Sequence, residues 1–438
     1  MAESITDRAW NKILEAHPGI LSAACEGVVY KLSADSIKEF REPRLMTKHD
    51  TSQSVPSPLK NNDLNVIALG GSPYEFAIGR FELFEEFPDM AGIRPQMISL
   101  PDYETLAVEN ITSESNAINA LIISQALDMF LGEEPGSTVE TFNGRMGSGA
   151  FSFFVNGKDG KRYPIDVKGA QLEIDGGFEN DNSVIIMEAK NVIHDDFNVR
   201  QLYYPFRRYH AFVKKPIRLV FSQFTNLTYH LYEYEFTDPT DYSSLNLINR
   251  ASYTFEDSRI SSSELWELYQ STQVLFDDNM ESADVPFIQA DRFDRVIALM
   301  ERMQDEPDGI STDDVVSFLG TVSRQGPYYI SAGKYLGLFE KGPRRGTTVL
   351  TKTGQEILAM CYRDRQLSFA RLMFQHEILN HFFGLSFITG QLPSRDSVIK
   401  KMEELNVCNP GKKGSMFTRR ARSVLGWLRW LMAIPDEE

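Results

Sequence analysis

The stretch "EIDGGFENDNSVIIMEAKN", Glu173 to Asn191, joins an acidic segment to a polar turn and an apolar run that ends in Glu-Ala-Lys. The run "SVII" indicates a buried central strand. Successive strand residues point to opposite faces of a sheet, so Glu188 and Lys190 share one face. If "QLEIDGG" is the antiparallel neighbour, joined through "FENDN", then Asp175 lies beside Glu188. The stretch therefore predicts two carboxylates and one ammonium group at a strand end.

These three groups are the set that cleaves a phosphodiester with the help of a hard cation. Asp175 and Glu188 would hold Mg²⁺, with Mn²⁺ as a substitute, and the metal would neutralise developing charge and lower the pKa of a water. Lys190 would position or stabilise the attacking water. The alternative is a solvated ion pair between Glu188 and Lys190, with Asp175 as an ordinary turn residue.

The composition is that of an ordinary soluble globular chain. Its 438 residues are 42% hydrophobic and 24% charged, and this length predicts roughly two to four domains. No stretch approaches the ~18 apolar residues that a membrane span needs, so we expect a cytoplasmic protein without membrane contact. Cys25, Cys361 and Cys408 lie far apart and form no CxxC pair, which argues against a disulfide framework or a cysteine zinc site.

Charge is distributed unevenly along the chain. The net charge of -16 argues against a surface covered with nucleic-acid-binding groups. The segment from Arg395 to Ile434 nevertheless has nine basic residues against three acids. The basic residues are Arg395, Lys400, Lys401, Lys412, Lys413, Arg419, Arg420, Arg422 and Arg429. The C-terminus is therefore the basic end of the chain.

The pattern of apolar residues predicts a mixed α/β protein with a helical C-terminal region. Residues 1–62 form an N-terminal arm or subdomain without a core, and residues 63–280 form a mixed α/β domain with one long helix, Ser115 to Gly132. Residues 285–362 carry three short helices and a Gly/Arg-tipped hairpin, the order of a winged helix that can place its third helix in the DNA major groove. Residues 363–438 are helical and could form a second helix-turn-helix.

Several motifs resemble the PD-(D/E)XK nuclease superfamily. Asp175 with Glu188-Ala-Lys190 resembles the superfamily signature, and "RQLYYPFR", Arg200 to Arg207, resembles the helix that follows it. "GRMGSGAFSF", "SRQGPYYISAGKYLGL" and "TRRARSVLGWLRWL" resemble segments of prokaryotic type II restriction endonucleases with C-terminal helix-turn-helix modules. Ile174 stands where the signature often has proline, at a position that supplies no ligand. Gly326-Pro327 interrupts the third helix of the winged-helix unit, so we expect that helix to start near Pro327.

The resemblance implies a Mg²⁺-dependent, sequence-specific endonuclease that hydrolyses double-stranded DNA in a restriction-modification system. It also implies a homodimer, which would present one active site to each strand, and a separately encoded DNA methyltransferase. Gln201 and Glu114 would complete the active site. The residues expected to contact DNA are Arg145, Ser148, Arg324, Gln325, Tyr328, Lys334, Arg344, Arg345, Arg419, Arg420 and Arg422.

Two other functions stay open at this stage. One is a winged-helix DNA-binding regulator without cleavage, which needs no clustering of Asp175, Glu188 and Lys190. The other is a modification-dependent endonuclease that reads methylated DNA. A zinc protease is not favoured, because "HEILNH" places its histidines five residues apart instead of four. The sequence also has no GxxxxGK[ST] motif for an ATP-driven motor.

Overall fold

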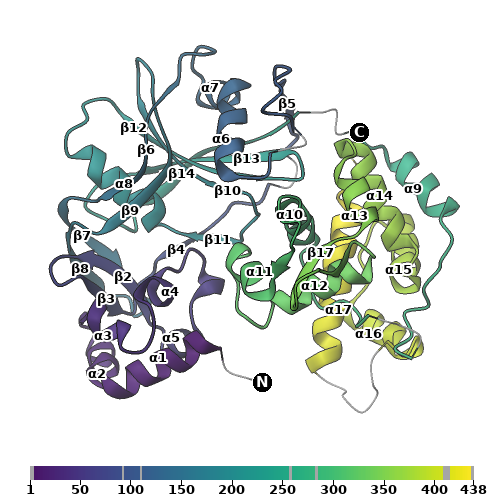
Figure 1. Cartoon of the computed structure of the whole chain (residues 1–438), viewed down its shortest axis with the longest axis horizontal. Coiled ribbons are helices and arrows are strands. Elements are labelled where there is room, and N and C mark those ends of the chain that lie inside the picture. Colours follow the sequence, from purple (N-terminus) through teal and green to yellow (C-terminus); the bar gives the residue numbers. More distant parts are fainter. Residues whose placement is uncertain are drawn as a thin grey trace.

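The computed structural model describes residues 4–90, 93–108, 111–255, 259–281, 285–407 and 415–435. Lys412, Lys413 and Cys408 lie outside these ranges. The class is mixed α/β, as predicted. Figure 1 shows the two large sheets and the N-terminal helices on one side of the molecule, and the helices from α9 (Ser262–Ser271) onward, with a small three-stranded sheet, on the other. Within the described ranges, no helix is long and apolar enough to cross a membrane.

A seven-stranded mixed sheet forms the centre of the α/β part, in the order β5-β14-β13-β12-β10-β9-β6. In that order the strands are Gln96–Met97, Leu245–Thr254, Thr228–Phe236, Ile217–Thr225, Val184–Lys190, Gln171–Glu179 and Val139–Gly147. β9 and β10 are antiparallel, which confirms the predicted hairpin. β10 and β12 are parallel, and the chain between them carries α8 (Arg200–His210).

Helices cover both faces of this sheet. α6 (Glu114–Ile123) and α7 (Ala126–Leu131) pack with Met187 on one face. α8 packs on the other face, where Leu202 and Ile186 belong to one cluster of buried residues. Because strand residues alternate between faces, β10 buries its apolar side chains on both sides, as a central strand should.

The prediction of one helix from Ser115 to Gly132 is wrong at its middle. Gln125 has a φ of 61°, in the left-handed region that α-helical residues do not occupy. The first helix therefore ends at Ile123, and the second begins at Ala126. Apolar periodicity continues through this break, so the sequence pattern alone does not reveal it.

The N-terminal region has a hydrophobic core, contrary to the expectation of an arm without one. Its helices are α1 (Ile5–Ala16), α2 (Gly19–Glu26), α3 (Ala34–Lys38), α4 (Pro43–Thr47) and α5 (Ser57–Lys60). They lie against a second sheet, β1-β3-β2-β8-β7, made of Tyr30–Ser33, Glu75–Gly79, Asn65–Gly70, Arg162–Lys168 and Ala150–Asn156. Trp10 and Ile13 are fully buried and share one cluster with Val66 and Ile78. The two sides of residue 62 thus form one packed region.

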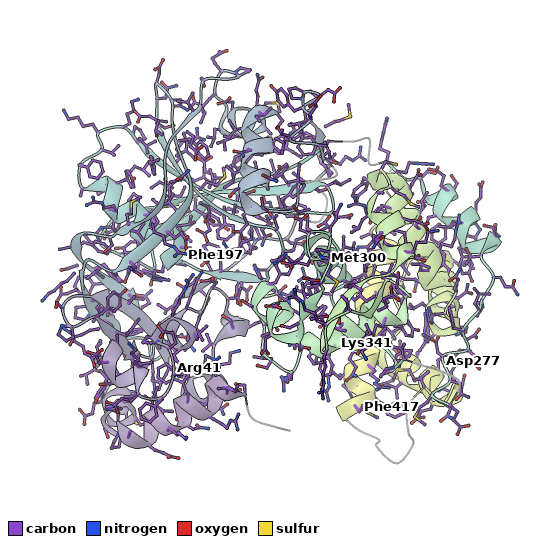
Figure 2. All side chains as sticks on the ribbon, in the orientation of Figure 1. Arg41, Phe197, Asp277, Met300, Lys341 and Phe417 are labelled. Carbon is purple, nitrogen blue, oxygen red and sulfur yellow. The ribbon has the colours of Figure 1, made fainter. Side chains whose placement is uncertain are left out.

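The helical part is built around a single large core. Its helices are α9, α10 (Phe293–Met303), α11 (Thr312–Phe318), α12 (Gly326–Tyr335), α13 (Lys352–Leu358), α14 (Tyr362–Phe374), α15 (Glu377–Thr389), α16 (Arg395–Glu404) and α17 (Ser415–Met432). A small antiparallel sheet, β15-β17-β16, consists of Ile310–Ser311, Thr347–Leu350 and Phe339–Lys341. Met300, labelled in Figure 2, is fully buried in the core, which also contains Trp427 of α17. Regions 285–362 and 363–438 therefore share one interior.

A buried ion pair connects the helical part to the central sheet. Glu301 of α10 lies 3.2 Å from the guanidinium of Arg365, whose side chain is only 2% exposed. The same carboxylate accepts hydrogen bonds from the Thr225 hydroxyl (2.8 Å) at the end of β12 and from the Asn226 amide (2.9 Å) in the turn that follows. Because the partners of Glu301 lie on α14, on β12 and in that turn, this residue fixes α10 against the sheet.

We predict that Glu301→Ala destabilises the protein by roughly 3 kcal/mol or more, because it leaves the Arg365 charge buried without its carboxylate. Urea unfolding followed by tryptophan fluorescence measures this, since Trp266, Trp427 and Trp430 all lie in the helical part. Glu356→Ala is the control, because its ion pair with Lys352 is exposed and should contribute little. Equal unfolding midpoints for the two variants would contradict the prediction.

Candidate active site

The predicted catalytic residues converge on the ammonium group of Lys190. Its Nζ lies 2.7 Å from Glu188 Oε1, 3.6 Å from Asp175 Oδ2 and 3.5 Å from Glu114 Oε1. Gln201 of α8 donates a hydrogen bond from Nε2 to the same Glu188 oxygen. All five predicted residues therefore belong to one cluster. This cluster contradicts the alternative of an isolated, solvated Glu188–Lys190 pair with an unrelated turn residue.

The hairpin register brings the two acids together. The β9–β10 ladder pairs Met187 with Gly176, and the next residues along the two strands are Glu188 and Asp175. Asp175 Oδ2 accepts a hydrogen bond from the Ala189 amide (3.0 Å), which holds the carboxylate against the end of β10. Gly177 permits the close packing, because a Cβ there would lie 2.2 Å from the ring of Phe142.

The two faces of the sheet contribute different side chains. Glu114 is the first residue of α6 and is 44% exposed, so it approaches the cluster from the solvent side. Gln201 comes from α8, and its buried Oε1 has no hydrogen-bond partner among the described residues. Tyr204, in contrast, is fully buried and donates its hydroxyl hydrogen to the Ala68 carbonyl (2.7 Å). Tyr204 is therefore a packing residue and does not face the cluster.

Burial and mutual repulsion alter the acidity of these groups. Burial raises the pKa of Glu188 to about 8, with Asp175 and Asp50 adding to the rise and Lys190 opposing it. Burial also raises the pKa of Glu114, again with Lys190 opposing and Asp175 adding. For Lys190, burial favours the neutral amine, but Glu188, Glu114 and Asp175 outweigh burial and raise the pKa of Lys190 well above its usual value. Lys190 is thus a permanent cation.

An N-terminal acid, Asp50, is a neighbour of the cluster that the sequence reasoning missed. Its carboxylate lies 3.3 Å from Lys48 Nζ, and its carbonyl accepts a hydrogen bond from the Asn198 amide (2.8 Å), two residues before α8. Burial would raise the pKa of Asp50, but Lys48, Lys190 and Arg200 outweigh it and lower that pKa. No sequence signal could have identified Asp50, because it lies more than 120 residues before the hairpin.

The oxygen atoms around Lys190 also suit a hard cation. Glu188 Oε1 and the Ala189 carbonyl lie 2.7 Å and 2.8 Å from the ammonium, and Asp175 Oδ2 lies 3.6 Å away. In the part of the chain that the structure describes, no three His, Cys, Asp or Glu side chains form a metal-binding group. The protein ligands would therefore be two carboxylates and one main-chain carbonyl, with waters completing the shell, an arrangement that Mg²⁺ accepts.

The predicted DNA contacts in the α/β part have protein partners. Arg145 Nε lies 2.9 Å from Glu173 across the β6–β9 pair, although the arginine side chain remains 67% exposed. Ser148 is only 1% exposed, and its hydroxyl donates to the Gly149 carbonyl (3.0 Å). A basic residue that the prediction omitted, Arg208, lies beside this loop, with Nη1 3.5 Å from the position of a Cβ on Gly149. Arg208, not Ser148, therefore presents a polar group to solvent here.

The predicted contacts in the helical part occupy several environments. Arg324 and Arg345 are exposed, and Arg344 is exposed but paired with Asp308. Gln325 accepts a hydrogen bond from Thr321 (2.9 Å) at the start of α12. The remaining residues are on α12 and α17. The Tyr328 hydroxyl accepts a hydrogen bond from Arg419 (3.1 Å), whereas Lys334 and Arg420 line a cavity. Arg422 is exposed. Of these residues, the structure brings Arg419 to Tyr328, and Lys334 and Arg420 to one cavity.

Comparison with known protein families finds matches over three segments. Residues 7–76, 79–254 and 295–436 match families described as Domain of unknown function, DUF6996, DUF6997 and DUF7226 respectively. No curated protein and no solved structure matches the chain. The middle segment contains Glu114, Asp175, Glu188, Lys190 and Gln201, whereas Asp50 belongs to the first. The cluster around Lys190, with its neighbour Asp50, thus draws on two of the three matched segments.

The raised pKa of Glu188 predicts a pH dependence of stability in protein kept free of metal with EDTA. Between the ordinary value near 4.5 and the folded value of about 8, the folded protein keeps a proton that the unfolded chain has released. Stability should therefore fall as pH rises through this window, by up to ~1.4 kcal/mol per pH unit. Glu188→Gln cannot titrate, so its free energy of unfolding should not show this fall. The difference between the variant's and the parent's free energy of unfolding should therefore increase in the variant's favour as pH rises.

Urea unfolding in steps from about pH 5 to about pH 8 tests this dependence. The exposed residue Glu82, changed to Gln, is the matched control. A difference between the parent and Glu188→Gln that stays constant across the window would show that Glu188 does not titrate there.

Proposed function

We propose that this protein is a Mg²⁺-dependent endonuclease that cleaves double-stranded DNA at specific sequences, as part of a restriction-modification system. The observation that carries the proposal is the convergence of Asp175, Glu188 and Lys190 at the end of β10. The Lys190 ammonium lies within 3.6 Å of three carboxylates, and charged side chains are seldom buried without a partner. The two carboxylates could hold a metal ion beside a scissile phosphate, and the ammonium could stabilise the negative charge that develops on it.

The topology around the cluster supports the same proposal. β6, β9 and β10 lie side by side as antiparallel neighbours, and α8 leads to the parallel strand β12 while α6 covers the opposite face. Asp175 and Glu188 therefore come from adjacent strands inside a sheet that is covered on both faces. In the helical part, the order α10, β15, α11, α12, β16, β17 is the order of a winged helix. α12 begins at Gly326, close to the expected Pro327.

Each group in the cluster has a role that follows from its environment. A bound Mg²⁺ or Mn²⁺ would supply Lewis-acid stabilisation and lower the pKa of a water. Lys190 cannot serve as a base, because its raised pKa keeps it protonated, so it stabilises negative charge on the phosphate. Glu114 has a raised pKa and is more exposed than Asp175 and Glu188, so it is suited to accept the proton that the attacking water releases. Gln201 fixes the orientation of Glu188.

The partners follow from the reaction. A homodimer would place one active site at each DNA strand, and a separately encoded methyltransferase would protect the host sequence. Arg324, exposed just before α12, is positioned to meet DNA if α12 enters the major groove. The net charge of -16 means that DNA affinity must come from a restricted basic surface.

We predict that Glu188→Ala and Lys190→Ala each reduce cleavage by ~100-fold or more, because charge stabilisation at the reacting phosphate is lost. DNA binding should stay within a few fold, since neither residue reads bases. The assay is digestion of a methylated and an unmethylated plasmid in Mg²⁺, Mn²⁺, Ca²⁺ or EDTA. Lys215→Ala is the control, because Lys215 forms an ion pair with Glu179 at the other end of β9.

The parent should cut in Mg²⁺ and Mn²⁺, and should not cut in EDTA. Parental rates in either active-site variant would remove the cluster from the reaction. Specific DNA binding without cleavage in any metal would instead support the winged-helix regulator. Cleavage of methylated plasmid alone would support the modification-dependent enzyme.

A second prediction concerns the helical part. Arg324→Ala should weaken DNA binding by ~10-fold or more, because an exposed arginine at the start of the third helix can make a charged contact to a phosphate or a base edge. At saturating DNA the cleavage rate should stay near that of the parent. Gel-shift titration at several salt concentrations measures the affinity. Arg8→Ala is the control, because Arg8 is an exposed arginine of α1 that is not among the expected DNA contacts, and an equal loss of affinity in both variants would contradict the assignment.

A further inference from the structure

We propose that a cavity in the helical part binds a small, flat aromatic molecule that carries one acidic group. The cavity has a volume of about 950 Å³ and lies between residues 275–280 and 285–287, the end of α12, the end of α14 and α17. Phe276, Tyr335 and His376 form its aromatic wall, and Lys334 and Arg420 contribute its positive groups. The site is separate from the Lys190 cluster, and the inference does not depend on the proposed endonuclease function.

The aromatic wall presents an open ring face. The rings of Phe276 and Tyr335 both stack on His376, with centroid distances of 4.6 Å and 3.8 Å and interplanar angles of 20°. Phe276 is nevertheless 50% exposed, although a side chain of this size gains more by being buried. Leu275 and Met280, which also line the cavity, are 58% and 41% exposed. A ligand ring that stacks on Phe276 would cover this apolar surface.

Hydrogen bonds hold this wall in place before any ligand arrives. The Phe276 amide donates to the Gln375 carbonyl (3.0 Å), and the Phe276 carbonyl accepts from the Glu377 amide (2.9 Å). Behind them, the fully buried carboxylate of Asp278 contacts His376 Nδ1 (2.9 Å) and accepts from the Ile378 amide (3.0 Å) and the Tyr335 hydroxyl. A wall fixed on folding loses little entropy when it binds a ligand.

The charges at the cavity favour an anion. Asp278 directs its carboxylate into the wall, and Asp277 is exposed and accepts a hydrogen bond from the Asn279 amide (3.0 Å). Lys334 is only partly buried, and the described residues provide no carboxylate within ion-pair distance of it. Arg420 lines the same space, with Nη1 donating to the Val407 carbonyl (3.2 Å). Lys334 is therefore the group available to neutralise a ligand's acid.

The lining also limits the class of ligand. A volume of about 950 Å³ is at the upper end of pockets that hold small molecules. Most of the other lining side chains are apolar, among them Leu275, Met280, Phe287, Leu336 and Val407. Such walls would not compensate several charges on one ligand. The shared chemistry is an aromatic ring system with a single carboxylate or phosphate, which an aromatic acid or a nucleoside monophosphate would supply.

Calorimetric titration of the full chain tests the proposal with four probes: 2-naphthoate, its neutral amide, AMP and adenosine. We expect at least one acidic probe to bind ~10-fold tighter than its neutral counterpart, a difference of about 1.4 kcal/mol. Binding of 2-naphthoate alone would identify an aromatic acid as the source, and binding of AMP alone would identify a nucleotide. No binding by any probe, or equal affinity within both pairs, would overturn the proposal.

Four variants locate the site. Lys334→Ala should abolish the difference between the acidic and neutral probes, and Phe276→Ala should weaken both by ~10-fold or more. The controls are Lys352→Ala, a lysine 89% exposed, and Phe212→Ala, a phenylalanine 60% exposed, neither of which lines the cavity. If Phe276→Ala unfolds, judged by circular dichroism, Phe276→Leu replaces it. Unchanged affinity in Lys334→Ala would place the bound probe elsewhere and overturn the assignment.

Discussion

The constraint on which the α/β part depends is the compensation of buried negative charge at Lys190. Glu188, Asp175 and Glu114 lie close enough to repel one another, and Glu188 is almost fully buried. Their proximity is tolerable because the Lys190 ammonium lies among them and because Glu188, whose pKa burial raises to about 8, keeps its proton at neutral pH. The β9–β10 hairpin, α6 and α8 each deliver one part of this arrangement. A protein that needed only a stable sheet would gain more from apolar residues at these positions, so the cluster is better explained by chemistry than by stability.

The segment directly after Lys190 leads from the cluster into the helical part. Val192 belongs to the core of the helical part, and the Ile193 carbonyl accepts a hydrogen bond from Arg295 of α10 (3.4 Å). Arg295 also lies 3.3 Å from Asp195. Because α10 is fixed in the same core as α12, a shift of the helical part would act on the backbone that directly follows Lys190. In the function that we propose, this connection would couple DNA recognition to cleavage.

The local features of the site could be predicted from the sequence, whereas its distant members could not. The two-residue period of a strand places Glu188 and Lys190 on one face, and a short polar turn fixes the register that brings in Asp175. Asp50 arrives through the packing of the N-terminal helices against the second sheet, which no local pattern encodes. The break at Gln125 escaped prediction for a related reason, because its left-handed backbone is imposed by tertiary packing and not by a glycine.

The environments of the basic residues also could not be predicted from the sequence. A run of arginines in the sequence indicates a charged segment, but only the fold decides whether each charge faces solvent, pairs with an acid or lines a cavity. Arg419 contacts Tyr328, Arg420 lines the cavity beside Phe276, and Arg422 alone of the three is exposed. Binding to DNA depends on exposed charge, so under the proposed function the C-terminal arginines would contribute less than their number implies. The proposal then requires exposed basic residues from separate elements, such as Arg324 before α12 and Arg208 near the end of α8.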